Sequence, residues 1–115
     1  MQRAVIDMPY IGGTLSTNAY KFKTRCTKPE VKAWIQILSK RVRALAIPQR
    51  QNYNIVVSYF FRDERHPDLD NLHKVIGDGL KVGMGVNDKY FKWRDENVFV
   101  GTIMPKISIV IEWQE

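Results

Sequence analysis

The apolar side chains of residues 31–45 recur every three or four positions, which is the spacing of one face of an α-helix. They are Val31, Trp34, Ile35, Leu38, Val42 and Leu45. Before them, Thr27 and Glu30 have the spacing of a capping box, and Pro29 is tolerated in a first turn. The sequence therefore predicts an amphipathic helix over residues 27–45, whose apolar face has to cover other apolar surface of the chain.

Strand-like runs rich in apolar and β-branched residues surround this helix. The predicted strands are 3–8, 53–61, 97–104 and 106–113. The run 53–61 is apolar enough to predict a strand with both faces buried. A second helix is predicted over residues 70–81, ended by Gly83 and Gly85. The order β-α-β-α-β-β predicts an α+β fold, with a small mixed sheet of about four strands and two main helices.

The length of 115 residues fits one domain, so we expect residues 1–115 to fold as a single unit. The one cysteine, Cys26, excludes an intramolecular disulfide and a multi-cysteine zinc site, and suits a reducing compartment. No run approaches the ~18 apolar residues of a membrane-spanning helix, and the first ten residues lack the apolar run of a signal peptide. We expect a soluble, cytoplasmic protein without a membrane partner.

The charge is unevenly distributed along the chain, whose net charge is +6. Residues 21–50 carry nine basic groups and one acidic group, whereas residues 51–115 carry eight basic and ten acidic groups. The basic segment would attract a polyanion such as a nucleic acid. A solvated helix face with extended Lys and Arg side chains explains the same pattern equally well.

Acidic residues gather after the strand 53–61. Pro67 favours an extended chain before it, and if that extension continues, the carboxylates of Asp68 and Asp70 point the same way. Two such carboxylates repel each other unless a cation lies between them, and oxygen ligands suit Mg²⁺ or Mn²⁺. Asp88, in the loop after the second helix, could fold back onto the same spot.

A structural role explains these acids as well. If the helix starts near Asp70, then Asp70, Lys74 and Asp78 follow on one face as an ion-pair ladder. Asp68 or Asp70 would then be an N-cap that complements the helix dipole.

The run Asp68–Lys74, Asp-Leu-Asp-Asn-Leu-His-Lys, followed by Asp78-Gly79-Leu80 and Asn87-Asp88, resembles the RusA-type Holliday junction resolvases. The segment 16–20, Ser-Thr-Asn-Ala-Tyr, is similar to the Ser/Asn-rich loop near the N-terminus of that family. The resemblance extends over nearly the whole chain.

The resemblance implies a Mg²⁺-dependent, homodimeric endonuclease that binds four-way DNA junctions and nicks two opposed strands. It implies metal-binding catalytic carboxylates at Asp68, Asp70 and Asp88, and an essential lysine at Lys74. Metal ions held by the aspartates would lower the pKa of a water molecule and neutralise developing charge. Lys74 would donate to the scissile phosphate or position the attacking water.

Two departures from the family pattern concern the acidic and the basic residues. The family often has a pair of acids where this chain has Asn87-Asp88, and a run of arginines where Arg62 and Arg65 are separated by two acids. We expect DNA contacts from Asn71 and from basic side chains in two stretches. The basic residues expected to bind DNA are Lys21, Lys23, Arg25, Lys28, Lys32, Arg62 and Arg65. Asn18 and Asp78 are expected to support the site.

Two other functions fit the same residues. One is a module that binds branched DNA without cutting it, with structural aspartates. The other is a small basic protein that assembles with an acidic partner. Metal-dependent cutting separates the nuclease from the binding module, and salt-sensitive DNA affinity separates both from the third function, since phosphate contacts weaken with salt.

Overall fold

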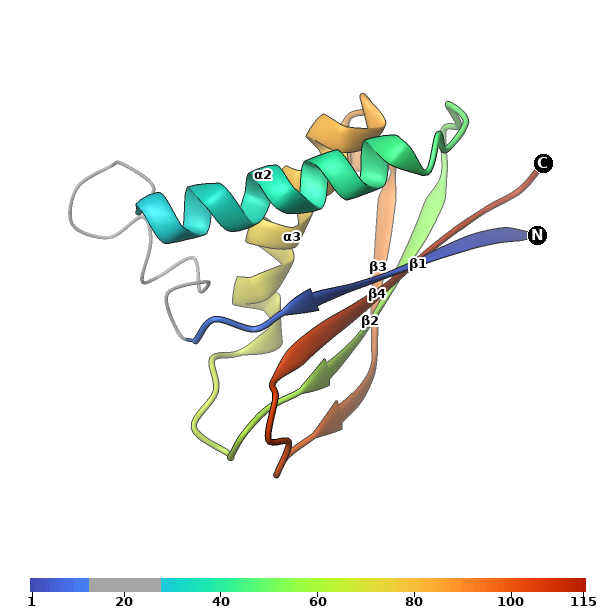
Figure 1. Ribbon diagram of the computed structural model, residues 1–115. Helices are drawn as coiled ribbons and strands as arrows, with labels where there is room; N and C mark the ends of the chain where they lie inside the picture. Colours follow the sequence, from blue (N-terminus) through green and yellow to red (C-terminus); the bar gives the residue numbers. More distant parts are fainter. Residues whose placement is uncertain (13–27) are drawn as a thin grey trace.

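The computed structural model describes residues 1–12 and 28–115 (Figure 1). Its elements are β1 (Gln2–Pro9), α2 (Pro29–Ala44), β2 (Tyr53–Phe60), α3 (Leu69–Met84), the short 3₁₀ helix η2 (Asp88–Tyr90), β3 (Phe91–Phe99) and β4 (Lys106–Trp113). The expected order β-α-β-α-β-β and the α+β class are confirmed.

The four strands form one mixed sheet in the order β1-β4-β2-β3. β4 runs antiparallel to both β1 and β2, whereas β2 and β3 are parallel. Parallel neighbours cannot be joined by a tight turn, and α3 is the crossover between these two strands (Figure 1). The chain therefore passes from the end of β2 into α3 and returns along the sheet edge as β3.

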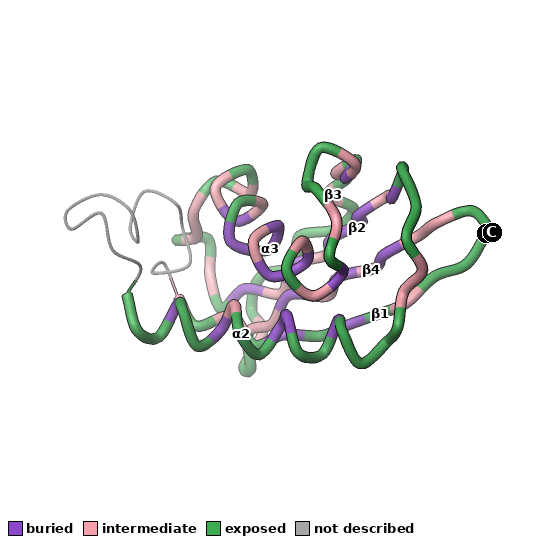
Figure 2. Tube along the Cα trace, turned by 90° about the horizontal axis from the view of Figure 1, so that it is seen from above, coloured by how far each residue is buried: buried purple, intermediate pink, exposed green. Residues whose placement is uncertain are grey.

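One face of the sheet and the inner sides of both helices form a common core (Figure 2). On β2 the alternate residues Ile55, Val57 and Tyr59 are fully buried within it. On the opposite face of β2, Val56 is buried, whereas Asn54, Ser58 and Phe60 are only partly covered. The expectation that both faces of this strand are buried is therefore wrong for its second face, which no helix covers.

The two helices pack closely because small residues of α3 face α2. A Cβ atom at Gly79 would lie 2.7 Å from Leu38 Cδ2, and one at Gly83 would lie 2.6 Å from the Ser39 carbonyl oxygen. Gly83 is therefore a contact residue inside the helix. The prediction that it ends the helix is wrong. The helix ends at Met84 and is capped by Gly85, whose φ of +68° lies in the left-handed region that favours glycine.

Besides the end of α3, predicted at residue 81 and observed at Met84, two predicted element starts differ by more than one residue. α2 begins at Pro29, with Lys28 at the N-cap and no capping side chain, while the predicted cap Thr27 lies outside the described residues. β3 spans Phe91–Phe99 and not 97–104. Its first half alternates apolar and charged side chains, as expected of an edge strand with one covered face, and this is a weaker apolar signal than a continuous run.

Several predicted residues lie outside the described ranges, namely Asn18, Lys21, Lys23, Arg25 and Cys26. Neither α2 nor α3, nor any other described helix, is long and apolar enough to cross a membrane.

Candidate active site

Asp68 and Asp70 lie at the start of α3. The helix begins at Leu69, so Asp68 occupies the N-cap position and Asp70 the first turn. An extended chain through both residues, which would point the two carboxylates the same way, is therefore not formed. The Asp68 side chain makes no capping hydrogen bond, and 94% of the Asp70 side chain is exposed. Both carboxylates are accessible to solvent at the helix N-terminus.

One turn further along α3, Lys74 and Asp78 form an ion pair. Lys74 Nζ lies 3.6 Å from Asp78 Oδ1, and Lys81 Nζ lies 3.8 Å from the same oxygen. Pairs this exposed contribute about 0–1 kcal/mol to stability. Asp78 thus lies between two lysines, and one of them, Lys74, is at the predicted site.

Asp88 begins the short helix η2, which follows the turn after α3. Its side chain lines a shallow pocket together with Lys74, His73, Gly77 and Trp93. A Cβ atom at Gly77 would lie 3.3 Å from the Trp93 ring, so the missing side chain lets β3 come close to the helix here. The loop therefore brings Asp88 to the same stretch of α3 that carries Lys74.

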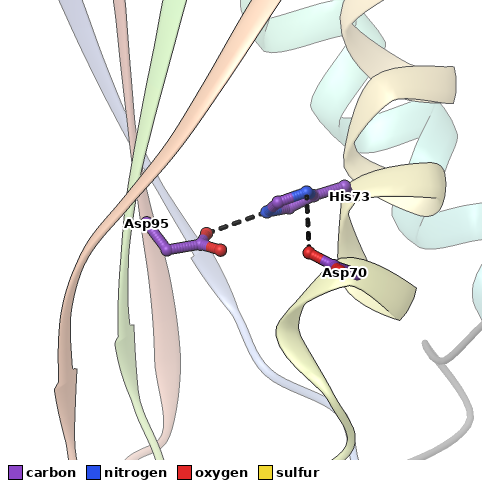
Figure 3. Close-up of side chains that lie close together, drawn as sticks. All are labelled: Asp70, His73 and Asp95. Carbon is purple, nitrogen blue, oxygen red and sulfur yellow. Dashed lines mark hydrogen bonds and ion pairs between the residues drawn. The ribbon is translucent and has the colours of Figure 1, made fainter.

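The compact group of metal-ligating side chains consists of Asp70, His73 and Asp95, one ligand atom of each lying within 4.8 Å of the others (Figure 3). His73 Nε2 is 2.8 Å from Asp95 Oδ1, and His73 Nδ1 is 3.8 Å from Asp70 Oδ1. It is the one such group of three within residues 1–12 and 28–115. Asp68 and Asp88 therefore do not join Asp70 at that spacing.

Asp95 was not among the residues expected from the sequence. It lies on β3 opposite Val57, just before a register shift that leaves Glu96 without a partner on β2. Such a bulge bends the strand and redirects the side chains beside it. One sequence signal could have placed Asp95 on the inner face of a strand. Phe91, Trp93 and Asp95 alternate with more exposed residues at the start of β3.

Tyr59 binds Asp95 through a hydrogen bond from the core side. The hydroxyl of this fully buried residue donates a 2.6 Å hydrogen bond to Asp95 Oδ1. Burial raises the pKa of the Tyr59 hydroxyl far above its usual range, and the hydrogen bond and negative charge of Asp95 raise it further. Tyr59 therefore remains a protonated donor.

The imidazole of His73 stacks on Trp93, with ring centroids 4.5 Å apart and planes 13° from parallel. Only 17% of the His73 side chain is exposed. Stacking on one side and the hydrogen bond to Asp95 on the other restrict the ring to one orientation.

The expected DNA-binding residues that are described lie in three places. Lys28 and Lys32 are exposed at the start of α2, and Asn71 is half-buried in the first turn of α3. Arg62 and Arg65 line a second pocket after β2. Arg65 pairs with Asp63 at 3.1 Å, and its backbone N–H and guanidinium hold the pKa of that carboxyl below its usual range.

Comparison with known protein families decides what kind of domain this is. A family model described as "Endodeoxyribonuclease RusA" matches residues 10–112.

The chain belongs to the RusA endodeoxyribonuclease family.

RusA is a family of nucleases. The match confirms the resemblance to this family that the acidic motif indicated. The match includes β2, α3 and β3, and so every residue of the acidic site described above. A search of curated proteins returns no match to the chain.

Proposed function

We propose that this RusA-family chain, acting as a single endonuclease domain, binds four-way DNA junctions and resolves them by paired nicks through metal-dependent phosphodiester hydrolysis. The observation that carries the proposal is the pocket in which Asp88 meets Lys74, one turn along α3 from the exposed Asp70, within a chain matched by a nuclease family. The corresponding biological role is in DNA recombination and repair, in the cytoplasm where such DNA is found.

The donor set fits a hard divalent cation. Asp68, Asp70 and Asp88 are exposed carboxylates, and the Asp68 side chain is not used as a cap. Oxygen ligands of this kind suit Mg²⁺, with Mn²⁺ as a substitute. We propose that these three residues hold the ion. When bound, such an ion lowers the pKa of water and neutralises charge on the reacting phosphate.

Lys74 acts on the phosphate directly in this proposal. Lys74 lines the same pocket as Asp88, and its ammonium group can donate hydrogen bonds to a non-bridging phosphate oxygen, where negative charge grows in the transition state. Asp78, 3.6 Å from the Lys74 nitrogen, restrains this flexible side chain and is a positioning residue. In this proposal Asn71, one turn before Lys74, contacts the bound DNA.

Basic side chains offset the repulsion between DNA and the acidic site. Lys28 and Lys32 at the start of α2 and Arg62 and Arg65 after β2 are all exposed. Contacts of such residues with phosphates position a nucleic acid without reading its sequence. With Lys21, Lys23 and Arg25, they form the proposed DNA-binding set.

Paired nicks need two active sites, and a homodimer with two-fold symmetry supplies them. Apolar side chains at the end of β3 and in the following connection are exposed, with 86% of Ile103 and 81% of Met104 accessible. A dimer that covered this surface would bury apolar area that the described chain leaves in water.

Cleavage of a synthetic four-way junction, labelled on each strand in turn, tests the function. We expect symmetric nicks in two opposed strands with Mg²⁺ and none with a chelator. Asp70→Asn should slow cleavage by about 100-fold or more, because metal-ion catalysis is worth several kcal/mol, while junction binding survives. Asp7→Asn is the matched control, since Asp7 is an exposed acid on β1 paired with Lys106 at 3.4 Å.

Two outcomes would contradict the proposal. Tight, salt-sensitive junction binding with no cutting by any divalent ion would indicate a non-catalytic module that binds branched DNA. Absence of both binding and cutting would show that neither the acidic motif nor the basic segment serves DNA.

A further inference from the structure

His73 lies between two carboxylates, and its hydrogen bond to one of them identifies a ring nitrogen that carries a hydrogen (Figure 3). Asp95 Oδ1 accepts a hydrogen bond from the Tyr59 hydroxyl at 2.6 Å and lies 2.8 Å from His73 Nε2. An ionised carboxylate can only accept hydrogen bonds. The Nε2 atom of His73 is therefore the donor in this contact and carries the hydrogen.

In the neutral imidazole, the other nitrogen, Nδ1, then presents a lone pair. This atom lies 3.8 Å from Asp70 Oδ1, which is too long for a hydrogen bond, and both atoms are acceptors. Two acceptors placed against each other are stabilised when a cation lies between them. Donor atoms bound to one divalent ion at about 2.0–2.2 Å each are roughly 3–3.6 Å apart when adjacent, so only a small movement of Asp70 is needed.

We propose that His73 Nδ1 is a further ligand of the metal ion held by Asp70, and that Asp95 and Tyr59 are positioning residues that set its tautomer and orientation. The inference rests on the proposed function only in that Asp70 holds an ion. Metal-binding histidines almost always donate their second N–H to a carboxylate or carbonyl, and Asp95 is that acceptor here.

A nitrogen ligand changes which ion the site prefers. A ligand set made only of carboxylates suits Mg²⁺, whereas an imidazole ligand suits transition metals. With His73 in the coordination sphere, the site should bind Mn²⁺ more tightly than Mg²⁺. The ring is already held for this role, since it stacks on Trp93 and is largely buried.

The chain supplies its own control, because its other histidine is His66. His66 stacks on Phe61 with ring centroids 4.3 Å apart, and its Nδ1 lies 3.0 Å from the Pro67 carbonyl oxygen. A carbonyl only accepts, so Nδ1 of His66 is occupied as a donor and is not a ligand.

Pulsed EPR on the protein loaded with Mn²⁺ tests the inference without any DNA. The protein is made once with ¹⁴N-histidine and once with ¹⁵N-histidine. We expect a nitrogen coupling to Mn²⁺ whose pattern changes with the isotope, which is absent in His73→Gln and retained in His66→Gln. Because the isotope comparison uses the unmodified chain, it holds even if a variant folds poorly.

Calorimetric titration with MnCl₂ and with MgCl₂ gives a second readout. His73→Gln and Asp95→Asn should each lower Mn²⁺ affinity about 10-fold, as loss of such supporting groups does, and lower Mg²⁺ affinity less. His66→Gln should leave both affinities unchanged.

The outcomes separate this inference from the proposed function. Metal-dependent junction cleavage without any nitrogen coupling in the unmodified chain would overturn the inference and leave the function standing. A His73-dependent coupling without cleavage of any DNA would support the inference and contradict the function. A coupling lost in His66→Gln but kept in His73→Gln would also overturn the inference.

Discussion

The hydroxyl of Tyr59 donates a 2.6 Å hydrogen bond to Asp95 across the parallel strands β2 and β3. Tyr59 is fully buried, whereas Asp95 is partly exposed beside the helix α3. The same carboxylate oxygen faces His73 Nε2. A residue of the core thereby sets the orientation of a group at the candidate active site.

Removing this hydroxyl should weaken metal binding. In Tyr59→Phe we expect Mn²⁺ affinity to fall about 10-fold, because Asp95 loses one of the two donors that orient it. The free energy of unfolding should fall by about 1 kcal/mol, the net contribution of one hydrogen bond. Calorimetric titration and urea denaturation measure the two quantities.

Tyr53→Phe is the matched control for that variant. Tyr53 is a buried tyrosine on the same strand, and its hydroxyl donates to the Pro48 carbonyl oxygen at 2.7 Å and accepts from Arg50 N–H at 2.6 Å. We expect a loss of stability at least as large, because two hydrogen bonds are removed, with unchanged Mn²⁺ affinity. Equal losses of affinity in both variants would show that Tyr59 acts only through general stability.

The stability of the fold should depend on Tyr59 at alkaline pH. Burial raises the pKa of its hydroxyl above the ordinary value of 10.0, so the protonated form is favoured in the folded state. Its contribution is complete below pH 10, where the unfolded chain is protonated too, and is lost progressively as the pH rises above 10. Denaturant unfolding at pH 8–11 should show this loss in the parent chain and a smaller one in Tyr59→Phe.

Lys74 and Lys81 allow catalysis to be separated from ion pairing. Both pair with Asp78 Oδ1, at 3.6 and 3.8 Å, but of the two it is Lys74 that lines the pocket of Asp88. We expect Lys74→Ala to lower the cleavage rate about 100-fold, as removal of one transition-state donor does, and Lys81→Ala to change it little. Single-turnover cleavage measures both. Equal losses would assign Lys74 a structural role through Asp78.

DNA affinity should depend on salt through the start of α2. Replacing Lys28 and Lys32 together by alanine should reduce the slope of log K against log salt by about 2, close to one unit for each phosphate contact. Arg3→Ala is the control, because Arg3 lies on β1 and pairs with Glu112 at 3.0 Å. The N-terminus that precedes β1 and the start of α2 lie at opposite ends of the molecule (Figure 1). Junction binding at several salt concentrations provides the slopes, and an unchanged slope in the lysine variant would exclude these two residues from the DNA surface.

Local signals were sufficient to predict most of the elements. Apolar side chains at helical spacing placed α2 and α3 to within a few residues, and the strand predicted at 106–113 is β4 as observed. The start of α3 at Leu69 follows Pro67, which disfavours helix in the residue before it. The acidic motif that marks the RusA family lies in one continuous segment, so it is visible without any tertiary structure.

The start of β3 was missed for a physical reason. Lys92 and Arg94 interrupt the apolar pattern, because β3 is an edge strand whose outer face meets water. The strand was therefore predicted six residues late, and Asp95 was assigned to no element. The prediction that Gly83 ends the helix was wrong because of helix–helix contact. Gly83 lies inside α3, where the absence of a side chain allows α2 to pack closely.

The sequence by itself determined the order of the elements, the acidic segment at the start of α3 and the family, because each depends on residues that are close together along the chain. Tertiary structure alone decided that Asp95 and Tyr59 meet His73. These residues are 22 and 14 positions away from His73 along the chain, and the parallel pairing of β2 with β3 brings them together. Strand pairing depends on the whole core and not on local preference, so the partners of His73 become known only when the sheet is formed.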